Sequence, residues 1–446
     1  MEVRDPLYGL IEYDNTEEKI INSRIFQRLR KIKQLALASY VYPAAHHTRF
    51  EHSLGVMHLS GKVATSLNLD DASKKIIRLA GLLHDIGHGP FSHVSENVLE
   101  KYVDKGILKK YKADNAHELL SLLLIQQIDE IRDILSDKEI EDIVLLLQAN
   151  DRRSIEHDIV SGPLDVDKID YLLRDGYFAG VKYGTFDLEK VFKSFTKIEI
   201  SREETQLGIT NEGIYSVEQL LLAKYHMNVQ VYQHRVRRIT DAMLVKGIEF
   251  AIEEGIEEII NIYKIKDTPE FLSDFISFDD ETLIRTILSK SKGWANDYFE
   301  RIANRKLFKE VFEIEINDKN FDDDIILESF QSLTKTQSTA MSEKIADILN
   351  IPPEHVIIDR HSTLNPTYRL YGKIDISNIM VKDLGTKSRY QFPSVSKIFS
   401  NSSIEPQKEM LYIYAPIDKI ITQETSQEFK INKKQELLGE IKEVLS

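Results

Sequence analysis

The chain has 446 residues, of which 42% are hydrophobic and 29% are charged, and this balance is typical of a globular protein with a substantial core. Acidic residues exceed basic ones and the net charge is −14, which disfavours general binding of nucleic acid or of an anionic membrane. There is no cysteine, so disulfides, thiol nucleophiles and Cys-ligated metal centres are excluded.

The sequence also lacks the signals of membrane insertion and secretion. No uncharged apolar run reaches the ~18 residues that a membrane-spanning helix needs. The segment Met1–Pro6 is too charged for a signal peptide. We therefore expect a cytoplasmic protein that has no membrane partner.

The first part of the chain, from residue 17 to about residue 265, is predicted to be mostly helical. Val56, Leu59 and Val63 recur at helical spacing, and further segments share this pattern, namely 74–86, 116–130 and 139–149. A long helix is predicted from about Ser216 through Gln219, Tyr225 and Arg235 towards Lys246.

Beyond about residue 300 the pattern becomes mixed. Phe312, Ile314 and Ile316 alternate with glutamates, which is typical of a strand, and further strand-like segments are 356–358, 368–374 and 411–414. Helices are predicted near 339–349, before Pro352, and around Leu437 and Ile441. We predict a mainly α protein, with a helical core over residues 1–265 that holds the functional site. A smaller α+β region over residues 266–446 is expected to serve assembly and regulation.

Histidines point to the first half as the place of chemistry, because 11 of the 13 lie at or before His234. The most informative segment is 81–93, where His84 and Asp85 are adjacent and glycines and two more histidines follow. His84 and His52 each share a helical stripe with buried apolar residues, so both are expected to point inward. A second such pair, His157-Asp158, is interpreted as a polar helix end before a turn.

The segment 165–175 places polar and apolar residues on opposite arcs of a helical wheel at ~100° per residue. Asp167, Lys168, Tyr171, Arg174 and Asp175 share the polar arc. For an isolated helix this arc could simply be a solvated face. The functional interpretation is that Asp167 completes a metal site while Lys168 and Arg174 meet phosphate.

Together, His52, His84, Asp85 and Asp167 offer two imidazoles and two carboxylates to one divalent ion, which would leave positions open for water and substrate. A bound divalent ion makes water easier to deprotonate near neutral pH. Metal-assisted hydrolysis of a phosphoester fits this set, and no G-x-S-x-G, P-loop or G-x-G-x-x-G motif is present. The donor set does not distinguish Zn, Mn, Mg, Fe and Ni, and we expect one ion per subunit.

Several motifs, taken in order, resemble the HD-domain phosphohydrolase superfamily. The chain is most similar to the deoxynucleoside triphosphate (dNTP) triphosphohydrolases related to the human sterile-alpha-motif and HD-domain enzyme. The matching segments are 5–9, 26–35, 49–56, 84–93, 165–175 and 232–234, and the likeness covers roughly residues 3–250. The resemblance implies a helical HD-domain core and hydrolysis of a dNTP to a deoxynucleoside and triphosphate by attack at the α-phosphorus.

The resemblance also implies roles for single residues. His52, His84, Asp85 and Asp167 match the four metal ligands. The positions that match catalytic residues are His117, His93, His88 and Glu118. The positions that match substrate contacts are Gln34, Leu35, Arg49, Lys168, Tyr171, Asp175, Lys224 and Tyr232. His117 would act as general acid at the leaving oxygen, although the sequence does not decide which histidine is acid and which is base.

Assembly and regulation are less closely specified. The resemblance implies a homotetramer or homodimer. Relatives that bind guanine nucleotide carry an aspartate where this chain has Asn22, while Arg30, Gln27 and Val41 are retained. The response to an allosteric nucleotide therefore stays open. Two other functions also stay open: an HD phosphohydrolase acting on another phosphoester, such as a dNMP or a cyclic nucleotide, and a nucleotide-sensing oligomer without catalysis.

Overall fold

Helices dominate the described chain, as the spacing of its apolar residues predicts. The computed structural model describes residues 1–148, 154–201, 204–317, 334–363, 376–400, 408–417 and 426–445. The prediction of a mainly helical chain with a strand-containing C-terminal region is confirmed. Within these described ranges, no helix combines the length and apolar character that crossing a membrane requires.

The chain forms two compact units whose segments interleave along the sequence. The first comprises residues 1–234, 255–286 and 366–404, and the second comprises 235–254, 287–365 and 405–446. The boundary predicted near residue 265 falls within the segment 255–286 of the first unit. The division of roles between a catalytic and a regulatory part remains a prediction.

The first unit begins with a hairpin and short helices. Strands β1 (Glu2–Asp5) and β2 (Gly9–Glu12) pair antiparallel, with Val3 opposite Ile11. Helix α1 (Asn15–Asn22) starts with a capping box between Asp14 and Glu17, which satisfies the free backbone N–H groups of its first turn. The short helices α2 (Arg24–Gln27), η1 (Arg28–Lys31) and η2 (Ala38–Tyr40) follow.

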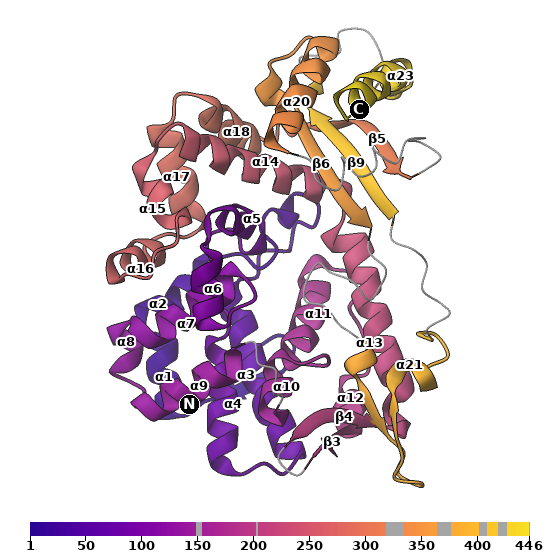
Figure 1. Ribbon diagram of the computed structural model, residues 1–446. Helices are drawn as coiled ribbons and strands as arrows, with labels where there is room; N and C mark the ends of the chain where they lie inside the picture. Colours follow the sequence, from indigo (N-terminus) through magenta and orange to yellow (C-terminus); the bar gives the residue numbers. More distant parts are fainter. Residues whose placement is uncertain are drawn as a thin grey trace. The chain divides into compact units, whose positions relative to one another are not determined.

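The helical core of this unit is built around α3 (Arg49–Ser66), which packs against α4 (Asp71–Leu83) and α11 (Val166–Ala179) (Figure 1). Val56, Leu59 and Val63 are fully buried, so the predicted stripe is confirmed. The remaining core helices are α5 (His93–Tyr102), α6 (Lys105–Tyr111), α7 (Ala116–Gln127), α8 (Asp129–Arg132), α9 (Asp137–Leu147) and α10 (Ile155–Ser161).

A four-stranded sheet with the order β3-β4-β7-β8 belongs to the same unit. Strands β3 (Phe195–Glu199) and β4 (Thr205–Thr210) form a hairpin, β4 pairs parallel with β7 (Met380–Lys382), and β7 pairs antiparallel with β8 (Arg389–Gln391). The remaining elements of this unit are α12 (Leu188–Ser194), η3 (Asn211–Gly213), α13 (Ile214–Met227), α15 (Glu257–Tyr263), α16 (Pro269–Ile276), η6 (Ile376–Asn378) and α21 (Phe392–Val395). Helix α17 (Asp280–Lys290) begins in this unit.

The single long helix predicted from Ser216 towards Lys246 is wrong. Helix α13 ends at Met227, a π-helical turn follows as η4 (Asn228–Tyr232), and α14 (Arg235–Glu253) starts as a new helix. Within the turn, the Tyr232 hydroxyl donates a hydrogen bond to Asp175, at 2.7 Å. A π-turn re-aims side chains at a functional position. Helical periodicity in the sequence cannot reveal this long-range contact.

The second unit holds α14, α18 (Trp294–Ala303), α20 (Lys335–Leu349), η5 (Pro353–His355) and α23 (Ser426–Leu445) with an antiparallel sheet of order β5-β9-β6. Its strands are β5 (Lys309–Ile316), β6 (Ile357–Thr363) and β9 (Lys408–Ala415). Ile345, Leu411, Ile413 and Leu437 share its core. The strands and helices predicted here are therefore confirmed, except that the predicted strand 368–374 lies outside the described residues.

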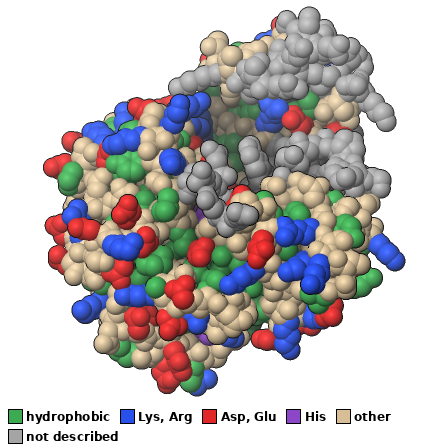
Figure 2. Space-filling view, turned by 60° about the horizontal axis from the view of Figure 1, so that its bottom comes forward, with side chains coloured by type: hydrophobic (Ala, Val, Ile, Leu, Met, Phe, Trp, Pro, Cys, Tyr) green, Lys and Arg blue, Asp and Glu red, His purple; other side chains and the backbone are tan. Residues whose placement is uncertain are grey.

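Charged side chains of both signs are mixed over the described part of one face of the molecule. On the face shown in Figure 2, Lys and Arg are interspersed with Asp and Glu among the described residues. No continuous basic stripe of the kind that tracks a nucleic-acid backbone crosses the described part of this face.

Candidate active site

Four side chains from three separate segments converge in the first unit. His52 lies in the first turn of α3, His84 is the C-cap of α4 with Asp85 next to it, and Asp167 lies in the first turn of α11. His52 Nε2 is 3.0 Å from Asp167 Oδ1 and 3.5 Å from Asp85 Oδ2. His84 Nε2 is 3.2 Å from Asp85 Oδ1 and 3.6 Å from Asp167 Oδ1. The structure thus brings the four predicted metal ligands together.

The two imidazoles are oriented as metal ligands. His52 Nδ1 donates to Asp170 Oδ2 at 2.7 Å, and His84 Nδ1 donates to the Gly81 carbonyl at 2.8 Å. Each Nε2 is buried and points at the carboxylates of Asp85 and Asp167 without a well-aligned hydrogen bond to any described residue. A buried nitrogen without a partner costs free energy, which coordination of an ion would offset. The donor set and its geometry therefore fit a divalent metal ion.

A buried ion-pair network supports His52 from behind. Arg174 binds both oxygens of Asp170, through Nε and Nη2 at 2.9 Å each, and its Nη1 binds Asp5 at 2.8 Å. Arg174 is fully buried and all three of its guanidinium nitrogens are bound to these carboxylates, so the prediction that it meets phosphate is wrong. A buried guanidinium needs carboxylate partners, and Arg174 finds them in Asp170 on α11 and Asp5 on β1. Apart from Asp167, whose side chain is 30% exposed, the polar arc of α11 is thus buried and not solvated.

A glycine lets this network approach α3. A Cβ added to Gly55 would lie 1.9 Å from Asp170 Oδ1 and 2.5 Å from Arg174 Nη2. Glycine in a helix interior is otherwise unfavourable. Gly55 therefore serves the close packing of α3 and α11, which holds His52 beside Asp167.

Arg49 links the metal ligands to the following loop. Its Nη1 binds Asp85 Oδ2 at 2.5 Å, and its Nε donates to Ser92 Oγ at 3.0 Å. Burial opposes ionisation of Asp85, but Arg49 and the nearby histidines hold the pKa of this carboxyl well below its usual range. Arg49 Nη2 is buried and has no hydrogen-bond partner among the described side chains and backbone groups. The Nη2 group of Arg49 can therefore donate a hydrogen bond to an additional anionic group.

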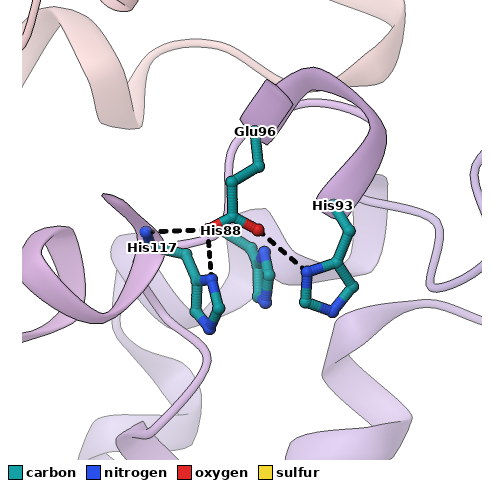
Figure 3. Close-up of side chains that lie close together, drawn as sticks. All are labelled: His88, His93, Glu96 and His117. Atoms are coloured by element: carbon teal, nitrogen blue, oxygen red, sulfur yellow. Dashed lines mark hydrogen bonds and ion pairs between the residues drawn. The ribbon is translucent and has the colours of Figure 1, made fainter. Parts of the chain in front are cut away.

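Next to these ligands, His88, His93 and His117 lie side by side around Glu96 (Figure 3). His93 Nδ1 donates to Glu96 Oε2 at 2.9 Å, and both Nδ1 and the backbone N–H of His117 donate to Glu96 Oε1. The rings of His88 and His117 stack with centroids 4.2 Å apart. His88 Nε2 is 3.3 Å from Asp85 Oδ1, which joins this cluster to the predicted metal ligands.

The cluster divides its histidines by charge. Burial lowers the pKa of His117, but the adjacent Glu96 and Glu118 outweigh burial and raise the pKa to about 9. Burial and the charges of Arg49 and His117 place the pKa of His88 well below its usual range. Burial also lowers the pKa of His93. At neutral pH the cluster therefore offers one imidazolium beside two neutral imidazoles.

Glu96 is the residue that the sequence reasoning missed. The sequence feature that could have identified Glu96 is its spacing from His93, because residues three apart lie on the same face of a helix such as α5. Glu118 was predicted instead. Its carboxylate accepts hydrogen bonds from the Asp114 backbone N–H and the Asn115 side chain, so it stabilises the start of α7, while the His117 ring is bound to Glu96.

A second group of side chains gathers several of the residues that were predicted to contact the substrate. His47 Nε2 is 2.7 Å from Asp175 Oδ1, and Tyr232 binds Asp175 Oδ2. The Tyr171 and Tyr232 rings lie 6.4 Å apart, and the Gln34 backbone N–H donates to the His47 carbonyl at 3.0 Å. Gln34 and Leu35 are buried. His47 was not predicted, because adjacent His46 and His47 carry no distinguishing pattern.

The two lysines that were predicted to contact the substrate are less available to it than expected. Lys168 Nζ binds Asp165 and also the Gly162 carbonyl, at 3.2 Å. Burial and the charge of Lys168 lower the pKa of Lys224 to about 7. The pair His157-Asp158 is structural, as interpreted: His157 binds the Leu146 carbonyl and Asp158 accepts the Leu207 N–H.

Comparison with known proteins agrees with this architecture. Residues 49–175 match the HD domain, and residues 198–389 match the HD associated region. The chain is 35% identical over 318 residues to an uncharacterized protein of Methanocaldococcus jannaschii, covering 71% of this chain and 61% of that one. It is 33% identical over 330 residues to the deoxynucleoside triphosphate triphosphohydrolase SAMHD1 homolog of Dictyostelium discoideum, covering 70% and 60%.

The chain thus spans about 60% of the length of these two relatives. Among solved structures, a hypothetical protein from Aquifex aeolicus is similar, with a TM-score of 0.71 and 28% identity over 97% of this chain and all of that one. The four predicted ligands lie in the segment that matches the HD domain, and the second match follows along the sequence. The chain therefore belongs to the HD-domain family, with an HD domain followed by an HD-associated region.

Proposed function

We propose that this protein is a metal-dependent dNTP triphosphohydrolase that cleaves a dNTP into a deoxynucleoside and triphosphate. The observation that carries the proposal is the convergence of His52, His84, Asp85 and Asp167 beside a cluster of three histidines, two of which are held by Glu96. The name of the Dictyostelium relative supports the choice of substrate class. One divalent ion per subunit, a homotetramer or homodimer and a cytoplasmic location are parts of the same proposal.

The proposed chemistry assigns tasks to the chain's own residues. A bound divalent ion would polarise a phosphoryl oxygen and lower the pKa of water. Arg49, whose Nη2 has no partner within the described ranges, would contact a phosphate oxygen. His117, whose pKa is about 9, would donate its Nε2 proton to the leaving 5′-oxygen, while Glu96 holds the ring through Nδ1. The neutral His88 and His93 would line the α-phosphate.

The sugar would lie against the Asp175 group. Asp175 would accept a hydrogen bond from the 3′-hydroxyl, and the rings of Tyr171 and Tyr232 would bound the sugar on one side. Leu35 and Tyr232 would crowd the 2′ carbon, so a ribonucleotide would have to bury an unpaired hydroxyl there. This arrangement supports a preference for deoxynucleotides.

The test is product analysis. Purified protein is incubated with each dNTP and with Mn²⁺, Mg²⁺ or Zn²⁺, with and without GTP, and products are separated by ion-exchange chromatography. Tripolyphosphate and deoxynucleoside in equal amounts are expected. Orthophosphate or pyrophosphate would reject attack at the α-phosphorus. Asp85→Asn should lose both metal and activity, whereas Asp71→Asn, on an exposed carboxylate at the start of α4, should keep both.

A second candidate is a nucleotide phosphohydrolase that acts on a dNMP. The observation that favours it is the state of the lysines: Lys168 is already paired with Asp165, and burial keeps the pKa of Lys224 near 7. Fewer cations would then face a phosphate chain that carries about four negative charges. Competition between dNTP, NTP, dNMP and cyclic dinucleotide in the same assay distinguishes the two. Tight binding of a nucleotide without its hydrolysis, whichever metal is added, would indicate a sensing role.

A further inference from the structure

The loop between the metal ligands and α5 contains two consecutive residues in an unfavourable backbone conformation. Phe91 has φ of 60° and Ser92 has φ of 53°, although neither is glycine. Such residues persist only where the surroundings hold them, and they cluster at functional sites. The next residue is His93, and Glu96 follows one turn later. The geometry of this turn therefore sets where His93 and Glu96 point.

The turn is held by a residue far along the chain. Asp280 Oδ1 accepts a hydrogen bond from the Phe91 backbone N–H at 2.7 Å, and Asp280 Oδ2 accepts one from the Lys33 backbone N–H at 3.1 Å. Ser92 Oγ in turn donates to the Lys33 carbonyl at 2.7 Å. Asp280 is only 3% exposed. One buried carboxylate thus joins two segments that are about sixty residues apart, and both of its oxygens are occupied by N–H donors.

A second link runs between the same parts of the chain. Arg28 Nε donates to the Phe278 carbonyl at 2.8 Å, and Arg28 Nη2 donates to the His88 carbonyl at 2.8 Å. Both Phe278 and Asp280 lie in the segment 198–389 that matches the HD-associated region. The HD-associated region therefore binds the Phe91 backbone directly through Asp280, and it is linked to the His88 carbonyl through Arg28, which binds both Phe278 and His88.

The contacts of Asp280 are not explained by the need to start α17. The neighbouring Asp279 fills that place, because its Oδ1 accepts the Thr282 N–H at 2.8 Å. Asp279 is also near Lys31, at 3.5 Å. Two adjacent aspartates thus have separate tasks, and only Asp280 reaches the histidine loop.

We propose that Asp280 is a positioning residue: it fixes the Phe91–Ser92 turn and thereby aims His93 and Glu96, and through Glu96 also His117, at the substrate phosphate. The proposal rests on the function proposed above. It assigns to the HD-associated region the task of setting the geometry of the histidine cluster. Asn at position 280 could accept only one of the two N–H groups, since its amide nitrogen is a donor.

The test compares Asp280→Asn with Asp279→Asn, a matched control that removes the same charge one residue away. Assays are run above the pKa of about 7 to which burial raises the pKa of Asp280. In Asp280→Asn we expect kcat to fall on the order of 10–100-fold with little change in KM or metal content, because a small misplacement of catalytic groups slows the reaction. Asp279→Asn should keep kcat even if its melting temperature falls.

Two readouts do not depend on the identity of the substrate. Diethyl pyrocarbonate labels accessible imidazoles, and mass spectrometry should show a several-fold change in the labelling rate of His93 in Asp280→Asn but not in Asp279→Asn. Hydrogen exchange of wild-type peptides that span residues 86–94 should show a strongly protected Phe91 N–H. This second readout applies even if Asp280→Asn does not fold.

The outcomes separate the two proposals. A wild-type protein that hydrolyses no nucleotide would reject the proposed function, while the labelling and exchange readouts would still decide the role of Asp280. Wild-type labelling of His93 and wild-type kcat in Asp280→Asn would overturn the positioning role. So would rapid exchange of the Phe91 N–H in the unmodified protein.

Discussion

At the level of single residues, Glu96 controls the charge of the histidine cluster. It accepts hydrogen bonds from both His93 and His117, but it outweighs burial only at His117, because the pKa of His93 stays lowered. A general acid must be protonated, so the rate should fall as pH rises through its pKa. The same pairing contributes folding stability that is full below pH about 6.5 and is lost as pH rises through about 9.

Glu96→Gln should therefore shift the alkaline limb of the pH–rate profile from near 9 towards 6.5, the ordinary value for histidine. At pH about 8 we expect a loss of kcat on the order of 10-fold or more, because little His117 remains protonated. The profile of Glu100→Gln is the control, since Glu100 accepts a hydrogen bond from the Ala116 backbone N–H and makes none to a histidine ring among the described residues. An unchanged alkaline limb in Glu96→Gln would rule out His117 as the acid.

Gly55 is a second residue whose role is decided by a contact. Gly55→Ala would force a Cβ against Asp170 and Arg174, so the buried pair behind His52 must separate. We expect a loss of about 3 kcal/mol in the free energy of unfolding, measured with urea, together with weaker metal binding. Gly439→Ala, also inside a helix but with no atom within 4 Å of the added Cβ, should be neutral or slightly stabilising.

At the level of elements, the turn after α4 is fastened to α7 through Ser121. Ser121 Oγ donates to the His84 carbonyl at 2.7 Å and accepts the Gly87 N–H at 2.9 Å. A Cβ on Gly87 would lie 2.2 Å from the Ser121 backbone N and 2.3 Å from the His117 carbonyl. Helix α7, which carries His117, can therefore approach the metal ligands only because residue 87 is glycine.

Gly87→Ala should push α7 away from the ligands, so kcat is expected to fall strongly while the metal is retained. The measurement is kcat together with metal content per chain. Gly89→Ala is the matched control, because its added Cβ would meet Phe275 at an ordinary 3.5 Å. Equal activity of the two variants would show that the spacing between α7 and the turn does not matter.

At the level of the whole molecule, a bound ion should stabilise the folded chain. The ligands come from α3, from the end of α4 and from α11, so the ion would join three segments that are separate in the unfolded chain. At a metal concentration 100 times the dissociation constant, the gain is about 2.7 kcal/mol. Chelation should lower the melting temperature of the wild type but not of Asp85→Asn. A chelator effect of equal size in both would place the stabilising ion elsewhere.

From the sequence alone, most elements and a candidate set of metal ligands could be predicted. Apolar spacing marks α3 and α11 because a helix must bury one face, and residue type together with the surrounding motif points to His52, His84, Asp85 and Asp167. Both kinds of signal are local. They hold whatever the distant parts of the chain do.

Only the tertiary structure decided which of these groups meet and what charge they carry. Glu96 reaches His117, Asp280 reaches Phe91, and Arg174 turns inward to Asp170 and Asp5. The break after α13 likewise belongs with the contact between Tyr232 and Asp175. Hydrogen bonds and pKa values depend on distances and burial, and residues far apart in the sequence acquire these only when the chain folds.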